Sequence, residues 1–303
     1  MIKPGAGRGE RRGIRYGRRM SWDDLDARLD RVPGTVSAYV GRLDGPPAWT
    51  RQPAATHYAA STMKVGVLLA LHRAAEADEI DLDTPVTVVN EFESARPGAR
   101  RFSCSRHYDN DDAVWERVGG TASPRWLAHR MITRSSNLAT NILLDQVGLP
   151  AVARSWALAG ARHSVTARGI EDLAAREVGI TNLVTAADLA ALLGGLVSGV
   201  DRPGPLAAPA ACAEMVNVLL AQERREDLAA GLPAGTRIAH KNGWVRGVRH
   251  GAGVVFPDDA PPYVIAVCTT TGPAAGQELT DDGCRLVADI SAAAWAARHH
   301  LTD

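Results

Sequence analysis

The order of hydrophobic segments along the chain is the feature that most restricts its fold. Strand-like alternation over residues 35–43 and 47–51 flanks Asp44-Gly45, a dipeptide typical of hairpin turns. Helical patterns fill the middle of the chain, and strand-like segments return at 236–239, 245–256 and 263–271, before a helical pattern over 279–299. This order predicts an α+β protein, in which an antiparallel sheet formed from both chain ends is flanked by helices and carries an inserted all-helical subdomain.

The domain organisation follows from the same pattern. Residues 1–20 are rich in arginine and glycine and have little to bury, so a disordered basic tail is expected. One large domain is predicted over 21–303, with its α/β part at about 21–58 and 205–303 and its helical part at about 59–204. No apolar stretch follows the basic residues, which predicts a cytoplasmic protein unless the start is misassigned.

Charge and cysteine content narrow the classes of partner. The formal net charge is zero, which favours neither nucleic acid nor an anionic membrane as a partner. The longest apolar run, residues 65–71, is far shorter than the roughly 18 residues that a membrane span needs. We expect a monomer that acts on a small molecule, with no metal and no organic cofactor. The cysteines are widely spaced without a C-x-x-C pair, which predicts buried free thiols: Cys104, Cys212, Cys268 and Cys284.

Lysine is rare in a chain that has 34 basic residues. Only Lys3, Lys64 and Lys241 are lysines, and arginine supplies the rest. Arginine stays protonated, whereas a buried lysine can lose its proton. The two lysines inside the predicted domain are therefore candidates for chemistry that arginine cannot perform.

The first lysine belongs to a Ser61-x-x-Lys64 pattern at the start of an almost uniformly apolar helical segment. Residues three apart lie on one face of a helix, and a helix that begins at Ser61 would place positive potential there. Desolvation lowers the pKa of a lysine, so a neutral Lys64 could accept the Ser61 proton. The pattern predicts an activated serine nucleophile, although S-x-x-K alone is common.

Two further motifs follow in the chain. Ser135-Ser136-Asn137 precedes an apolar helical segment, for which its residues are also good caps. Lys241-Asn242-Gly243 begins an extended segment that continues with Trp244. Their order and their placement on a helix-entry loop and on a strand are much more specific than either triplet.

Together the three motifs resemble those of the class A β-lactamase and penicillin-binding superfamily of serine hydrolases, whose set is S-x-x-K, S-D-N and K-T-G. The resemblance covers about residues 35–300. Asn141 follows Asn137 as in the family's S-D-N-x-x-x-N. Residues 182–190 (NLVTAADLA) and 231–241 (GLPAGTRIAHK) are also similar to family segments.

The resemblance implies a role for each matching residue. Ser61 would form the acyl-enzyme, Lys64 would act as base or proton relay, and Ser135 would pass a proton to the leaving nitrogen. The backbone N–H groups of Ser61 and Trp244 would form the oxyanion hole. The residues expected to bind or hold substrate are Asn137, Lys241, Asn242, Gly243 and Trp244, with Arg249 or His250 binding a carboxylate.

The match departs from the family in three places. Ser136 stands where the family has Asp, and Asn242 stands where it has Thr or Ser. The family's Ω-loop motif R-x-E-x-x-L-N, whose glutamate activates water, corresponds here to residues 168–174 (RGIEDLA), with the glutamate shifted by one. Glu171 is the best candidate for that base, followed by Asp172 and then Glu177, and an ordinary surface charge or a partner for Arg168 is the alternative.

Three functions fit these motifs. The first is a serine hydrolase that opens a β-lactam or a related amide or ester. The second is a D-Ala-type peptidase, an acyltransferase or a biosynthetic esterase, which the altered loop favours. The third is a sensor module that is acylated once and does not turn over. The cluster of His107, Asp109, Asp111 and Asp112 is interpreted as a solvated loop and not as a metal site.

Overall fold

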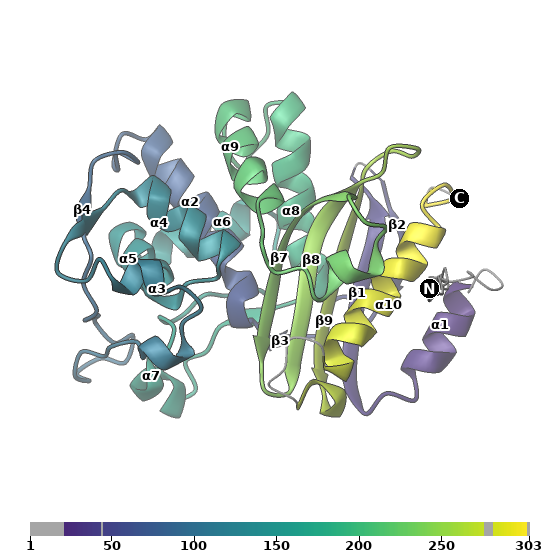
Figure 1. The fold of residues 1–303 in the computed structure, drawn as a ribbon, viewed down its shortest axis with the longest axis horizontal. Helices are drawn as coiled ribbons and strands as arrows, with labels where there is room; N and C mark the ends of the chain where they lie inside the picture. Colours follow the sequence, from purple (N-terminus) through teal and green to yellow (C-terminus); the bar gives the residue numbers. More distant parts are fainter. Residues whose placement is uncertain (1–20, 44, 276–280, 302–303) are drawn as a thin grey trace, which may run out of the picture.

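A five-stranded antiparallel sheet forms the centre of one half of the molecule (Figure 1). The computed structural model describes residues 21–43, 45–275 and 281–301. The sheet has the order β2-β1-β9-β8-β7, with the bounds β1 (Gly34–Arg42), β2 (Pro47–Arg51), β7 (Arg237–Val245), β8 (Val248–Phe256) and β9 (Tyr263–Thr271). Strands from both ends of the chain therefore meet in one sheet, which confirms the predicted fold class.

Helices cover both faces of this sheet. On one face lie α1 (Trp22–Leu29), the 3₁₀ turn η3 (Leu228–Gly231) and α10 (Asp282–Ala296), whose apolar side chains form one core cluster with the sheet. On the other face lie α8 (Ala186–Asp201) and α9 (Pro209–Leu220). Because both faces are covered, β8 is buried along almost its whole length instead of alternating between buried and exposed positions.

The helical half is built around α2 (Lys64–Glu76), which is buried on nearly every side. Around it pack α4 (Pro124–Thr133), α5 (Asn137–Val147) and α6 (Leu149–Leu158). The apolar run after Lys64 made this burial predictable, because a helix that is apolar all round must lie inside the protein. Helix α8 falls in the predicted helical part, but it packs against β1, β8 and β9. Its apolar side chains belong to a second core cluster, which joins this face of the sheet to the helical half.

Several short elements connect the longer helices and strands. They are β3 (His57–Tyr58) paired with β6 (Leu183–Val184), β4 (Val86–Thr87) paired with β5 (Thr121–Ala122), the turns η2 (Arg106–Tyr108) and η4 (Gly272–Ala275), and the helices α3 (Asp112–Trp115) and α7 (Leu173–Glu177). No helix within the described residues is both long and apolar enough to cross a bilayer.

The chain differs from the sequence expectations at a few boundaries. The α-helix does not begin at Ser61: a 3₁₀ turn, η1 (Ala60–Met63), holds this residue, and α2 begins at Lys64. The final helix begins at Asp282 and is capped by Asp281, while residues 279 and 280 of the expected helix lie outside the described residues. The basic tail at 1–20 and Asp44 of the hairpin turn lie outside the described residues.

Candidate active site

A cavity of about 510 Å³ lies where the sheet edge meets the helical half. Its walls come from η1, from the loop between α4 and α5, from β7 and from the segment around α7. Because β7 is the sheet edge nearest the helices (Figure 1), its backbone faces the cavity without a further strand in between. The cavity brings together seven of the residues singled out from the sequence: Ser61, Ser135, Asn137, Glu171, Asn242, Gly243 and Trp244.

Ser135 lies between the two buried lysines. Its Oγ is 3.2 Å from Lys64 Nζ and 3.1 Å from Lys241 Nζ. Ser135 has a φ of 60°, a left-handed conformation that a non-glycine residue adopts at an energetic cost. Such backbone strain is common at functional sites, and here it occurs at the residue whose hydroxyl lies within hydrogen-bond distance of both lysine amines.

Lys64 is completely buried and makes three polar contacts. Its Nζ lies 2.7 Å from the Ser135 carbonyl oxygen, 2.9 Å from Asn137 Oδ1 and 3.2 Å from Ser135 Oγ. Burial lowers the pKa of Lys64 to about 7, against the opposing effect of the negative charge on Asp109. A neutral amine has two N–H groups and one lone pair, so two of these contacts can receive N–H groups while the lone pair accepts a proton.

Lys241 is held on the opposite side of Ser135. Its Nζ donates to the backbone carbonyl and to Oδ1 of Asn242, each at 2.9 Å. Burial and the nearby charge of Lys64 hold the pKa of Lys241 well below its usual range. Two amines this close to one hydroxyl disfavour double protonation, so the pair can carry a proton to or from Ser135.

Gly243 lets the β7 backbone lie close to the backbone of Ser61. A Cβ atom at this position would lie 3.0 Å from the backbone nitrogen of Ser61 and 3.1 Å from that of Thr62. A side chain here would require β7 or η1 to shift by a few tenths of an ångström, so glycine lets β7 lie this close without displacement. This close approach is what an oxyanion hole shared between Ser61 N–H and Trp244 N–H requires.

The loop before α7 brings a carboxylate to the cavity. The Asn141 side chain donates from Nδ2 to the Ile170 carbonyl oxygen and accepts at Oδ1 from Ile170 N, each at 2.8 Å. Glu171 follows with a φ of 66°. Glu171 Oε2 accepts from Ser105 N at 3.0 Å, while Oε1 is buried without a protein partner among the described residues. Burial raises the pKa of Glu171.

The other two acid candidates lie elsewhere. Asp172 is fully buried, caps α7 through Ala175 N, and accepts hydrogen bonds from Ser94 and Ala95. Glu177 is exposed at the end of α7 and does not line the cavity. Of the three, Glu171 alone faces the site.

Two sequence expectations do not match the placement of the side chains. Arg249 does not line the main cavity: its guanidinium pairs with Asp281 at 2.5 Å and lies 4.7 Å from the Trp244 ring centroid, so it supports that ring from behind. His250 is buried, with Nε2 2.8 Å from the Tyr58 carbonyl oxygen. Each side chain is already engaged by the protein, Arg249 by the N-cap of α10 and His250 by the backbone of β3.

The Asn242 side chain is also engaged by the protein. Its Oδ1 accepts from Lys241, and its amide hydrogen-bonds the buried Asp227, whose pKa burial raises to about 7. Asn242 therefore orients Lys241, and its capacity to donate to a substrate carboxylate is limited by Asp227. The sequence carries no motif that would have indicated Asp227.

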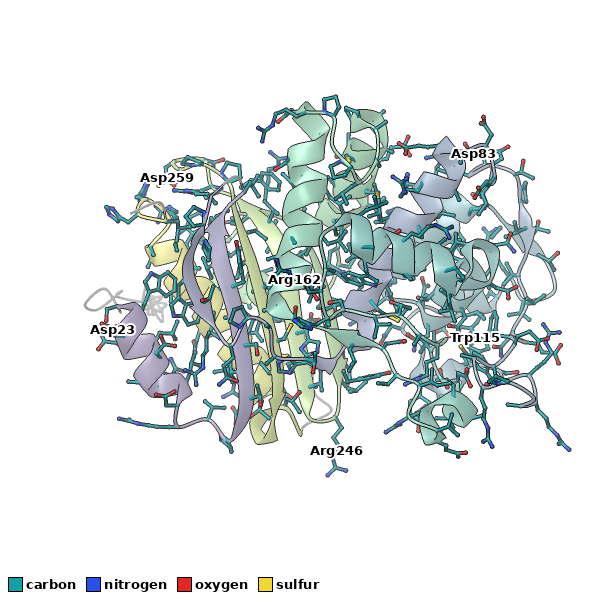
Figure 2. The ribbon with its side chains drawn as sticks, turned by 180° about the vertical axis from the view of Figure 1, so that it is seen from behind. Asp23, Asp83, Trp115, Arg162, Arg246 and Asp259 are labelled. Carbon is teal, nitrogen blue, oxygen red and sulfur yellow. The ribbon has the colours of Figure 1, made fainter. Side chains whose placement is uncertain are left out.

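The cavity rim contains cationic side chains that motif reasoning missed. They have no spacing pattern in the sequence and meet only in the folded chain: Arg176, Arg224 and Arg246. Arg168 bonds the Tyr58 hydroxyl and the Gly169 carbonyl oxygen instead of Glu171. Figure 2 shows Arg246 projecting outward from the β7–β8 hairpin.

The fold is of the serine hydrolase type, and its cavity places Ser61 and Ser135 beside the buried amines of Lys64 and Lys241. The model of the β-lactamase enzyme family matches residues 21–297, so the chain belongs to that family. It is similar in structure to a β-lactamase from Sphaerobacter thermophilus DSM 20745, with a TM-score of 0.73, 24% identity, and coverage of 92% of this chain and 98% of that chain.

Two other solved structures show the same fold. PBP-A has a TM-score of 0.73 and 22% identity, with 91% of this chain and 94% of that chain covered. An ancestral class A β-lactamase (GNCA) has a TM-score of 0.73 and 21% identity, with 91% and 98% covered. Comparison with curated protein sequences gave no match.

Proposed function

We propose that the protein is a serine hydrolase that forms an acyl-enzyme on Ser61 with a β-lactam or a related cyclic amide or ester and then hydrolyses it. The observation that carries this proposal is the placement of Ser135 Oγ between Lys64 Nζ and Lys241 Nζ, in the same cavity as Ser61. This arrangement suits a reaction in which one proton must leave a nucleophile and another must reach a leaving nitrogen.

In the proposed acylation, Ser61 Oγ attacks the carbonyl carbon while its proton passes to neutral Lys64. The oxyanion receives hydrogen bonds from the backbone N–H groups of Ser61 and Trp244. Ser135 Oγ then gives its proton to the leaving nitrogen as the C–N bond breaks, and the proton on Lys64 or Lys241 replaces it. Water activated by Glu171 would release the acyl group.

The test is intact-protein mass spectrometry over time after mixing the protein with a penicillin and a cephalosporin. The expected result is an adduct on Ser61 that clears as the substrate disappears. Ser61→Ala should abolish both the adduct and the turnover. Turnover retained by Ser61→Ala would overturn the mechanism.

A second candidate is a D-Ala-type peptidase, an acyltransferase or a biosynthetic esterase. It is favoured by one observation: counting from Arg168, Ile170 occupies the family's glutamate position, and Asn141 holds the Ile170 backbone there. PBP-A, which is similar to this chain, has been solved as an L158E mutant in an acyl-enzyme complex with penicillin-G. A Ser61 adduct that persists with penicillin, together with transfer from D-Ala-D-Ala peptides or thioesters, would favour this candidate.

The remaining expectations extend this proposal. The substrate would be a small acyl compound held without metal or cofactor, and the protein would act as a cytoplasmic monomer. Positive side chains at the rim, Arg176 and Arg246 among them, suit a substrate with a carboxylate.

A further inference from the structure

The loop that contains Asp109 holds the Ser135-Ser136-Asn137 segment from outside. Asp109 Oδ2 accepts from Leu138 N at 2.8 Å and from Ser136 Oγ at 3.2 Å. The preceding residue, Tyr108, offers its carbonyl oxygen to Asn137 Nδ2 at 2.9 Å. Tyr108 and Asp109 therefore fix three consecutive residues at the start of α5: Ser136, Asn137 and Leu138.

These bonds fix the start of α5, and one of them leads on to Lys64. Ser136 is the N-cap of α5, with its Oγ accepting from Ala139 N at 3.1 Å. Asn137 Oδ1, whose amide is anchored by Tyr108, lies 2.9 Å from Lys64 Nζ. A carboxylate at the first turn of an 11-residue helix also interacts favourably with the helix dipole.

The family's S-D-N motif has its carboxylate at the middle position, where this chain has Ser136. We propose that Asp109 is a positioning residue that supplies this carboxylate from the neighbouring loop, so that Asp109 and Ser136 together replace the single aspartate of the motif. The inference deepens the proposed function and rests on it for the role of the loop in acylation.

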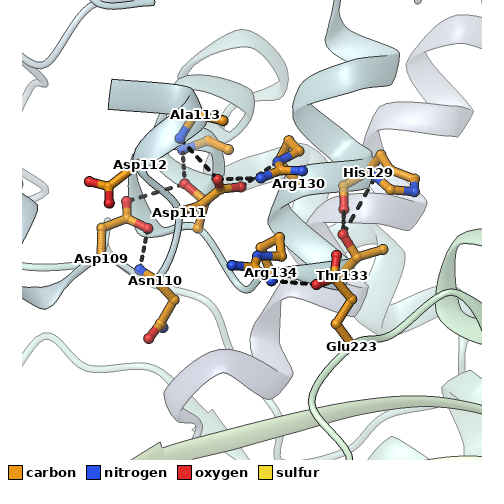
Figure 3. A network of polar contacts seen from close by, with 12 residues as sticks. Asp109, Asn110, Asp111, Asp112, Ala113, His129, Arg130, Thr133, Arg134 and Glu223 are labelled. Carbon is orange, nitrogen blue, oxygen red and sulfur yellow. Dashed lines mark hydrogen bonds and ion pairs between the residues drawn. The ribbon is translucent and has the colours of Figure 1, made fainter. Parts of the chain in front are cut away.

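Asp109 also acts on Lys64 through its charge. Among the described groups, its negative charge is the largest influence that opposes the lowering of the Lys64 pKa by burial. The other titratable groups around this centre come from different elements: Lys241 from β7, Glu171 from the loop before α7, Cys104 from the loop before η2, and Arg224, whose Nη2 lies 3.4 Å from Asn110 Oδ1. Asp111 is neutralised by its ion pair with Arg130 (Figure 3).

The scarcity of lysine makes a direct test feasible. With only Lys3, Lys64 and Lys241 in the chain, ¹³C-labelled lysine gives three side-chain signals whose titration can be followed without any substrate. The variants are Asp109→Ser, Ser136→Asp and the exchanged double variant D109S/S136D. Asp112→Ser is the matched control, because Asp112 is an exposed neighbour that pairs with Arg106 at the surface.

We expect Asp109→Ser to lower the Lys64 pKa by about 0.5–1 unit, because an opposite charge is removed, and to slow acylation of Ser61 by roughly tenfold or more. The exchanged double variant should recover most of both changes, since it returns one carboxylate to the same place. Asp112→Ser should leave both unchanged.

An unchanged Lys64 titration in Asp109→Ser, or a double variant no better than Asp109→Ser, would overturn the inference. If Asp109→Ser fails to fold, the Lys64 pKa and the acylation rate of the double variant are compared with those of Asp112→Ser. Values in the double variant far below those of Asp112→Ser would then overturn the inference. Absence of any adduct on the unmodified protein would count against the proposed function alone, because the lysine titration still tests Asp109.

Discussion

The Nζ of Lys64 lies 2.7 Å from the carbonyl oxygen and 3.2 Å from the Oγ of Ser135, and it is completely buried. The backbone contact fixes the direction of the amine, and the hydroxyl contact gives it a proton partner. Burial supplies the remaining condition by lowering the pKa of Lys64 to about 7. The fold thus makes a lysine neutral enough to act as a base near neutral pH.

The acylation rate should therefore rise with pH and level off above about pH 7, as Lys64 loses its proton. Lys64→Arg keeps the positive charge but removes the base, and it should slow acylation by about 10²–10⁴-fold. The measurement is the rate of Ser61 adduct formation between pH 5.5 and 8.5. A flat profile, or activity retained in Lys64→Arg, would contradict the assignment.

Glu171→Gln should lengthen the life of the acyl-enzyme by about 10²-fold while leaving its formation nearly unchanged. The reason is that Glu171 lines the cavity and has a buried Oε1 without a partner among the described residues. Glu177→Gln is the control, because Glu177 lies exposed on the adjoining helix α7. Equal adduct lifetimes in the two variants, followed by mass spectrometry, would exclude Glu171 as the water-activating group.

Gly243→Ala should lower the acylation rate by about 10²–10³-fold, because its Cβ would push β7 away from the Ser61 backbone nitrogen. Gly204→Ala is a suitable control, since its nearest atom, the Arg202 carbonyl oxygen, is 4.0 Å from the added Cβ. Thermal melting of both variants separates loss of the site from loss of the fold. Normal acylation by a folded Gly243→Ala protein would argue against this oxyanion hole.

Gly66→Ala should destabilise the protein by about 1–3 kcal/mol, although alanine is the better helix former by about 1 kcal/mol. The added Cβ would lie 2.9 Å from the ring of Trp156, which is fixed by a hydrogen bond from its Nε1 to Thr166 Oγ1. Gly194→Ala in α8 meets nothing closer than 3.9 Å and should be neutral or stabilising. Urea unfolding measures both, and a stable Gly66→Ala protein would refute the packing argument.

The free energy of unfolding should fall as the pH is lowered from about 6.5 towards 4. Burial lowers the pKa of His57 and His250 to about 4 and that of His240 to about 3. Between about pH 4 and 6.5 these histidines therefore bind protons in the unfolded chain but not in the folded chain, which favours unfolding as the pH falls. Asp227, with its pKa raised to about 7, and Glu171, whose pKa burial also raises, give the opposite slope, but the three buried histidines outnumber these two acids.

We expect the free energy of unfolding to fall by roughly 2–4 kcal/mol between pH 6.5 and 5. Each histidine whose effect is not cancelled by a buried acid contributes about 1.4 kcal/mol per pH unit. Urea unfolding at a series of pH values measures it. Asn in place of His57 should flatten the slope, whereas His163→Gln, at an exposed position, should not. A slope of the opposite sign would show that the buried acid dominates.

The three motifs were predictable from sequence because short-range spacing determines them. Ser61 and Lys64 lie one turn apart wherever that segment becomes helical, and the apolar residues that follow must be buried. The strand bounds at Pro47–Arg51 and Tyr263–Thr271 agree with the expected ones, since strong β-forming residues there are bounded by turn residues. Thr185 caps α8 for a similarly local reason, because its side chain accepts from Asp188 N three residues later.

Only the tertiary structure decided which groups surround those motifs. Arg249 and His250 were expected at the substrate, but their long-range partners Asp281 and Tyr58 hold them in the sheet. Asp109 was interpreted as part of a solvated loop, yet it replaces the missing carboxylate beside Ser136 from 27 residues away. The sequence itself determined the reactive residues and their order, because these depend on local spacing. Their charge states, orientation and support depend on burial and on contacts between distant segments, which exist only once the chain has folded.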